Sequence, residues 1–163
     1  MGNVPNPLTR IVSGGQTGVD QGALDAALQA GFPCGGWCPR GRRAEDGPID
    51  MSYPLVEFAG GYTARTLANV RDSDATAIIY FDQLEGGTEN TLAFCMEQRK
   101  PYKLIDASEI DPDRAGELIR QFVIAGRIAT LNVAGPRASK QPGAYAYARS
   151  AVGGALDLGE HNP

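Results

Sequence analysis

Hydrophobic and polar positions change their spacing several times along the chain, and these changes predict alternating strands and helices. Apolar, β-forming runs predict strands at residues 9–13, 55–58, 75–81, 101–106 and 129–134. Apolar positions three or four residues apart predict helices that start near residues 17, 62, 86, 111 and 142. This order is typical of an α/β sandwich with a mainly parallel sheet and helices on both faces.

Local signals indicate where some helices begin and which face they bury. Thr17 and Asp20 have the spacing of a capping box, which predicts that the first helix starts near Thr17. Asp111 followed by Pro112 predicts the start of the fourth helix, because proline is favoured at the first helical position. Gly126 is the expected end of that helix.

The helix predicted at residues 62–72 has two faces of different character. Ala64, Leu67 and Ala68 are expected to point inward, while Arg65 and Asn69 share a polar face four residues apart. That polar face either stays in water or contributes to a binding site.

Residues 32–53 are rich in glycine, proline and charged residues, and they predict a long irregular segment. A segment of this kind inside a compact domain is usually functional or disordered. If it folds over the sheet edge, Arg40, Arg42 and Arg43 could reach an oxyanion; otherwise they only solvate the loop. Trp37 could pack against a base or against the loop itself.

Length and composition indicate one globular domain. The chain has 163 residues, of which 42% are hydrophobic and 21% are charged, so we expect a single domain with flexible tails at 1–8 and 159–163. A net charge of −4 argues against a general nucleic-acid binder. No apolar run approaches the ~20 residues of a membrane span, and the start lacks a secretory signal, so we expect a cytoplasmic protein.

The three cysteines are expected to be free thiols. Their number is odd, and three residues separate Cys34 from Cys38, unlike the two of a zinc knuckle or redox pair. The single histidine, His161, lies in the tail, so no metal site is predicted. Cys95 falls on the apolar stripe of a predicted helix, where it serves as a small core residue.

Three strand ends run into glycine-rich or small-residue turns that open helices, at residues 13–20, 86–91 and 134–140. In a parallel sheet these turns meet at the carboxyl ends of the strands, and their free N–H groups suit a phosphate or another oxyanion. The candidate ligand-binding residues are Gly14, Gly15, Gln16, Thr17, Gly18, Asp20, Arg40, Arg65, Asn69, Gly86, Gly87, Thr88, Gly135, Arg137 and Ser139.

Each turn has a simpler alternative. The first is neither a Walker loop nor a strict Gly-x-Gly-x-x-Gly, and it could be a tight turn with a capping threonine. In the third, Arg137 and Lys140 could be solvated surface charges. In the second, Glu89 could complement the helix dipole, accept a ribose hydroxyl, or act as a general acid or base.

The sequence offers no histidine triad, nucleophile elbow or metal cluster, which argues against acyl hydrolysis. An enzyme built on this chain would have to use a carboxylate as its acid or base. Asp20, Asp46 and Glu89 are the candidates, and Glu89 is our tentative catalytic residue.

Several blocks together resemble the family known as putative molybdenum carrier proteins. They are Ser-Gly-Gly-Gln-Thr-Gly-Val-Asp at 13–20, Trp-Cys-Pro-Arg-Gly-Arg at 37–42, Ala-Glu-Asp-Gly at 44–47 and Asn-Val-Ala-Gly-Pro-Arg at 132–137. That family is similar to a circularly permuted branch of the Rossmann-like SLOG superfamily, which includes YpsA, DprA and the lysine-decarboxylase-like (Lonely Guy) proteins. The resemblance covers roughly residues 10–156 and implies a Rossmann-like sheet with a nucleotide or anion pocket at the glycine turns.

The resemblance also implies possible cargo and chemistry. The family name implies molybdate or molybdenum cofactor, whose pterin phosphate would suit the same pocket. In Lonely Guy relatives a Pro-Gly-Gly-x-Gly-Thr-x-x-Glu motif implies phosphoribohydrolase activity. Here 86–89 reads Gly-Gly-Thr-Glu, which lacks the proline and one glycine and spaces the glutamate differently.

We therefore predict a Rossmann-like domain that binds a small anionic molecule as a carrier or sensor, without turnover. The ligand is a nucleotide-like or pterin phosphate, or an oxyanion such as molybdate. The alternative is a nucleotide-processing enzyme that cleaves an N-glycosidic bond, with Arg65 and Arg137 holding the phosphate. We also expect a homo-oligomer, with neither nucleic acid nor membrane as a partner.

Overall fold

The computed structural model describes residues 4–157. Its centre is a five-stranded sheet in the order β2-β1-β9-β7-β8, in which every neighbouring pair is parallel. In that order the strands are Cys34–Gly35, Arg10–Val12, Thr130–Ala134, Ala75–Tyr80 and Tyr102–Asp106. The helices are α1 (Val19–Gln29), α2 (Tyr62–Arg71), α3 (Gly86–Glu97), α4 (Pro112–Gly126) and α5 (Ala144–Leu156).

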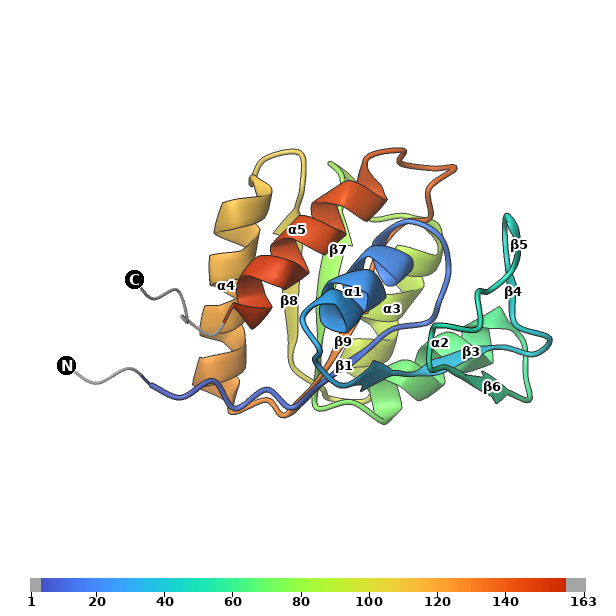
Figure 1. Cartoon of the computed structure of the whole chain (residues 1–163), viewed down its shortest axis with the longest axis horizontal. Helices are drawn as coiled ribbons and strands as arrows, with labels where there is room; N and C mark the ends of the chain where they lie inside the picture. The colour runs from blue at the N-terminus through green and yellow to red at the C-terminus, as the bar shows by residue number, and fades with distance from the viewer. Residues whose placement is uncertain (1–3, 158–163) are drawn as a thin grey trace.

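Helices cover both faces of the sheet, with α1, α4 and α5 on one face and α2 and α3 on the other (Figure 1). Successive side chains of a strand point to opposite faces, so a strand covered on both sides is apolar throughout. On β7, Ala77 and Ile79 enter the core shared with α1, α4 and α5, while Ile78 packs with Val70 and Cys95. The predicted three-layer Rossmann-like sandwich is therefore confirmed.

The segment 32–53 contains four short strands joined by turns, whereas the sequence predicted a long irregular segment. Besides β2, it contains β3 (Trp37–Pro39), and β4 (Arg43–Ala44) pairs with β5 (Gly47–Pro48) as an antiparallel hairpin. β3 pairs in parallel with β6 (Val56–Phe58) in a separate two-stranded sheet. The strand predicted at 55–58 therefore exists but lies outside the main sheet.

This segment has a small core and a fixed backbone of its own. The core consists of Leu24 from α1 with Cys38, Ala44, Ile49, Tyr53 and Leu55. Arg42 lies across the loop and donates hydrogen bonds to the carbonyls of Asp50, Tyr53 and Leu55 at 2.8–3.1 Å. The guanidinium of Arg42 thus orders the loop and does not line the cleft, so neither predicted alternative, an oxyanion contact or a solvated charge, describes this residue.

The first helix begins two residues later than predicted. Gly18, with φ of +83°, precedes α1, and no side chain caps this helix. The capping box predicted from Thr17 and Asp20 is therefore wrong. The hydroxyl of Thr17 instead accepts the N–H of Ala138 at 3.1 Å and donates to Glu45. A partner 121 residues away has displaced the local one.

The fourth helix starts as predicted and ends differently. The side chain of Asp111 accepts the N–H of Arg114 at 2.8 Å, and Pro112 is the first helical residue. The left-handed residue that ends the helix is Arg127, with φ of +52°, and Gly126 is still helical.

The buried face of α2 is polar at one end, which corrects the predicted orientation. Arg65, Ala68 and Asn69 are buried, whereas Ala64 is exposed and Leu67 is half-buried. The apolar stripe was a poor guide because this part of α2 borders a polar cleft and not the apolar core.

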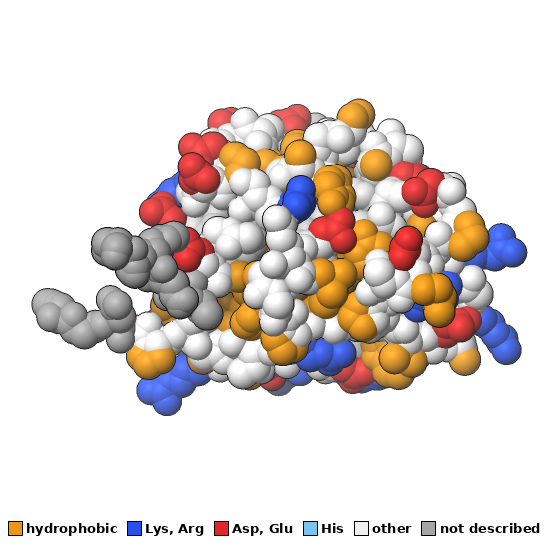
Figure 2. All heavy atoms as spheres, viewed as in Figure 1, with side chains coloured by type: hydrophobic (Ala, Val, Ile, Leu, Met, Phe, Trp, Pro, Cys, Tyr) orange, Lys and Arg blue, Asp and Glu red, His pale blue; other side chains and the backbone are white. Residues whose placement is uncertain are grey.

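The remaining features concern the surface and the ends. No helix among the described residues is long and apolar enough to cross a membrane. In Figure 2 several acidic side chains gather at the upper left of the face that carries α1, α4 and α5, near α4, while most basic side chains lie along its lower and right edges. Leu8 is buried in the main core, so the predicted tail at 1–8 is too long, while residues 159–163 lie outside the described part.

Candidate functional site

A cleft of about 520 Å³ lies at the carboxyl ends of β1, β7 and β9, where the three turns meet. Parallel topology explains this, because strands that run in one direction end at one edge. The predicted site residues that line the cleft are Gly14, Gln16, Asp20, Arg65, Asn69, Gly86, Gly87, Thr88, Gly135, Arg137 and Ser139.

Two glycines of the first turn serve its packing and do not line the cleft. Gly15 and Gly18 have φ of +86° and +83°, a conformation that L side chains rarely adopt. A methyl group on Gly15 would lie 2.5 Å from the side chain of Leu55, and one on Gly18 would lie 2.4 Å from the carbonyl of Pro136. Thr17 likewise lies outside the cleft lining.

Arg40 and Glu89 do not line the cleft either. Both are exposed, and at the start of α3 it is Glu85 that borders the cleft. This placement gives no support to the catalytic or ligand-positioning roles predicted for Glu89, or to an anion contact from Arg40. Asp46 is also exposed and outside the lining.

Arg65 is the most unusual residue of the cleft, because its charge is buried without a full set of partners. The residue is 8% exposed, and its Nε has no hydrogen-bond partner among the described residues. A methyl group on Gly14 would lie 1.9 Å from Nη1 of Arg65, so the glycine makes room for the guanidinium. The ring of Tyr62 lies 6.0 Å from the Cζ atom of Arg65.

Asp20 is the buried carboxylate beside this guanidinium. Its Oδ2 accepts the N–H of Gln16 at 3.2 Å. Burial raises the pKa of Asp20 to about 6, against the opposing effects of the Arg65 charge and of hydrogen bonds. The cleft thus contains a carboxyl group that changes its charge close to neutral pH.

Asn69 lines the cleft but already uses its amide group. Its Oδ1 accepts the N–H of Trp37 at 2.9 Å, and its Nδ2 donates to the carbonyl of Trp37 at 3.0 Å. The indole of Trp37 donates to Asp72 at 2.8 Å and packs edge-on against Phe58. Asn69 therefore holds β3 against α2, and Trp37 packs against its own segment and not in the cleft.

The second turn presents free backbone donors. No side chain caps α3, and the N–H groups of Gly87 and Thr88 have no acceptor within the part of the chain that the structure describes. Lys140 also lines the cleft, and its Nζ lies 4.0 Å from where a Cβ on Gly86 would be. Positive charge and unpaired N–H groups therefore meet at this end of the cleft.

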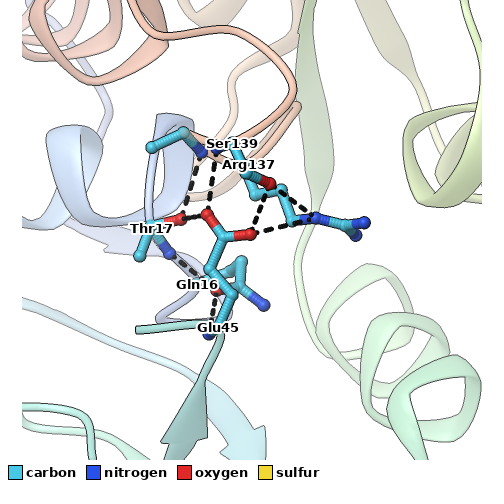
Figure 3. A network of polar contacts seen from close by, with 6 residues as sticks. Gln16, Thr17, Glu45, Arg137 and Ser139 are labelled. Atoms are coloured by element: carbon cyan, nitrogen blue, oxygen red, sulfur yellow. Dashed lines mark hydrogen bonds and ion pairs between the residues drawn. The ribbon is translucent and has the colours of Figure 1, made fainter. Parts of the chain in front are cut away.

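The third turn is occupied by a carboxylate of the protein. Glu45, at the tip of the β4–β5 hairpin, contacts Thr17, Arg137 and Ser139 (Figure 3). The side chain of Gln16 joins the same network by accepting the N–H groups of Thr17 and Glu45 at 3.0 and 2.8 Å. This network fastens the hairpin to the rim of the cleft.

Sequence reasoning missed several residues that line the cleft, namely Glu45, Tyr62, Tyr80, Phe81 and Asn132, and it discussed Lys140 without including it among the candidate ligand-binding residues. Tyr80 and Phe81 lie at and just after the carboxyl end of β7, so the positional rule that found the glycine turns could have included them. Nothing local marks Glu45 or Tyr62, because their places depend on how a hairpin and a helix fold against the sheet.

Comparisons with known proteins agree with the fold. The model of the circularly permutated YpsA SLOG family matches residues 11–156. A crystal structure named "Putative molybdenum carrier protein", from Syntrophus aciditrophicus SB, is 41% identical and has a TM-score of 0.89. The match covers 93% of this chain and 96% of that chain. No curated protein matches the chain.

Proposed function

The chain belongs to the circularly permutated YpsA SLOG family, and we propose that its cleft binds a small phosphorylated or oxyanionic ligand. The favoured ligand is a nucleotide-like or pterin phosphate, with a bare oxyanion such as molybdate as the smaller possibility. The protein then acts as a carrier or sensor. The observation that carries this proposal is the buried guanidinium of Arg65, whose Nε has no partner among the described residues.

A buried charge without enough partners is costly, so a ligand that pairs with it gains binding energy. An anion bound in the cleft would pair with the buried positive charge of Arg65, and a guanidinium fork fits the geometry of phosphate and carboxylate oxygens. Burial raises the pKa of the neighbouring Asp20 carboxyl group to about 6, so Asp20 loses its balancing negative charge as the pH falls through that value.

The size and the walls of the cleft favour a ligand larger than a bare oxyanion. About 520 Å³ falls within the roughly 300–1,000 Å³ of small-molecule sites. Tyr62, Tyr80 and Phe81 provide aromatic surface on which a base or a pterin could stack. Lys140 and the free N–H groups of α3 offer a second place for negative charge. The name of the similar crystal structure favours molybdenum cofactor or molybdate among these ligands.

Asp20 supports cleavage of an N-glycosidic bond as a second candidate function. General acids and bases work best with a pKa near the working pH, and Asp20 lines the cleft with a pKa of about 6. In this alternative Asp20, and not Glu89, protonates the leaving base, a water molecule adds to the sugar carbon that the base leaves, and Arg65 holds the phosphate.

Titration calorimetry with adenosine monophosphate, inorganic phosphate and molybdate tests the binding proposal. Arg65→Met keeps the apolar stem and removes the charge, and we expect it to weaken binding about tenfold to a hundredfold. Arg40→Met is the matched control, since Arg40 is exposed and outside the cleft. Thermal unfolding of both variants checks that they fold, and Arg65→Lys provides a milder change.

If Arg65→Met and wild type bind every probe equally well, the anion does not lie at Arg65 and the proposal fails. Chromatography of adenosine monophosphate incubated with wild type and Asp20→Asn separates the two functions. Free adenine released by wild type alone would favour the enzyme.

A further inference from the structure

Three hydrogen bonds and one ion pair converge on the carboxylate of Glu45. Oε2 accepts the hydroxyl of Thr17 and the N–H of Ser139, the latter at 3.0 Å. Oε1 accepts the hydroxyl of Ser139 at 2.6 Å and forms an ion pair with Nε of Arg137 at 3.1 Å. A carboxylate has about four lone-pair positions, so these hydrogen bonds use most of its accepting capacity. The same hydrogen bonds lower the pKa of Glu45, which is therefore ionised at neutral pH.

The side chains of Ser139 and Arg137 are thus engaged with Glu45, while the far end of Arg137 stays open to a ligand. Nε of Arg137 donates to the hydroxyl of Ser139 at 3.2 Å and lies 3.1 Å from Oε1 of Glu45 in the ion pair. Figure 3 shows the two terminal nitrogens of Arg137 pointing away from Glu45. Arg137 lines the cleft, and no described residue accepts a hydrogen bond from these two nitrogens.

We propose that Glu45 is a positioning residue that holds the guanidinium of Arg137 ready for the negative group of the ligand. The inference rests on the proposed function, since it assumes an anion in the cleft. Fixing a long arginine side chain costs conformational entropy, and a protein that fixes it before the ligand arrives spares the ligand that cost. The β4–β5 hairpin thereby contributes to ligand binding by holding Arg137 in position.

A simple electrostatic argument predicts the opposite effect of removing Glu45 on the affinity for an anion. Glu45 carries a negative charge on the wall of an anion site, so its removal should strengthen anion binding. The same result would follow if Glu45 filled a cradle that the ligand's anion must enter by displacing it. Positioning predicts weaker binding after the negative charge is removed, so the sign of the effect decides between these views.

The experiment compares Glu45→Gln and Glu45→Ala with Asp46→Asn, using calorimetry with adenosine monophosphate, inorganic phosphate and molybdate. Asp46 is the neighbouring carboxylate, exposed and outside the cleft, so its variant controls for the lost charge. We expect both Glu45 variants to weaken binding about three- to tenfold and Asp46→Asn to leave it unchanged. In an Arg137→Ala background, Glu45→Gln should cause no further loss.

A spectroscopic measurement tests the positioning without any ligand. The side-chain Nε–H signal of Arg137 should be sharp and slow to exchange with solvent in the wild type, and fast to exchange in Glu45→Gln. Unchanged or tighter binding by the Glu45 variants overturns the inference, as does an equal loss in the Arg137→Ala background. Failure of the wild type to bind any probe overturns the proposed function, while the Nε–H signal still reports whether Glu45 orders Arg137.

Discussion

Replacing Asp20 by asparagine should stabilise the protein at neutral pH and have little effect in acid. The carboxyl group is buried beside Arg65, and burial raises its pKa from 3.8 to about 6 in the folded protein. In the unfolded chain the group is in water and keeps its usual pKa. Asparagine has the shape of the protonated acid, and its amide oxygen can still accept the N–H of Gln16.

The sign and the size of the effect follow from proton linkage. A folded pKa above the unfolded pKa means that the folded state holds the proton more tightly. The stability that comes from the protonated group is complete below about pH 3.8 and is lost as the pH rises to about 6. A shift of roughly two units at 1.36 kcal/mol each corresponds to about 3 kcal/mol of unfolding free energy above that range.

Urea unfolding of wild type and Asp20→Asn between pH 3.5 and pH 8 measures the difference in unfolding free energy with a precision of about 1 kcal/mol or better. The variant should gain up to about 3 kcal/mol at pH 8 relative to wild type, and the gain should shrink toward zero at the acid end. Asp46→Asn, which alters an exposed carboxylate, is the control and should show no such trend. A difference between Asp20→Asn and wild type that stays constant over the whole range would refute the reasoning.

Two further predictions concern the backbone, and the free energy of unfolding in urea checks both. Gly135→Ala should destabilise the protein by about 1–3 kcal/mol, because its Cβ would lie 2.6 Å from the carbonyl oxygen of Ile79. Gly153→Ala should stabilise the protein by about 0.5–1 kcal/mol, because Gly153 lies within α5 and has open space around it. Equal effects of the two glycine variants would contradict the packing argument. Arg127→Gly should stabilise by up to about 1 kcal/mol, because Arg127 ends α4 in the left-handed conformation that glycine adopts without strain. A loss of stability in this variant would show that the arginine side chain contributes more than the strain costs.

The fold was predictable because its signals are local and repeated. The unbroken apolar run of β7, with Ala77, Ile78 and Ile79, reflects a strand covered on both sides, and such a pattern needs no knowledge of its neighbours. The start of α4 was equally predictable, because Asp111 finds its partner three residues away. Thr17 shows the limit, since a distant partner in the third turn takes the hydroxyl that would have capped α1.

The place of the cleft could be predicted from the sequence, but the use of each side chain in it could not. Arg65 and Asn69 share a face of α2 and look alike in the sequence as polar candidates. In the structure the amide group of Asn69 is hydrogen-bonded to the backbone of Trp37, 32 residues away, while Nε of Arg65 has no partner among the described residues. Which of two equivalent polar residues stays available depends on distant chain segments, and no local pattern reports that.

The three turns are alike in composition but differ in what their hydrogen-bond donors already bind. This difference determines where in the cleft a negative group of the ligand can bind. In the third turn the N–H and hydroxyl of Ser139 are taken by Glu45, and Gly15 and Gly18 of the first turn are needed for packing. In the second turn Gly87 and Thr88 line the cleft, and their N–H groups have no acceptor in the described part of the chain. A negative group of the ligand therefore finds unused backbone donors at the start of α3. The glycine content of a turn thus shows where a backbone can approach a ligand, whereas the partners of its N–H groups show where the ligand can bind.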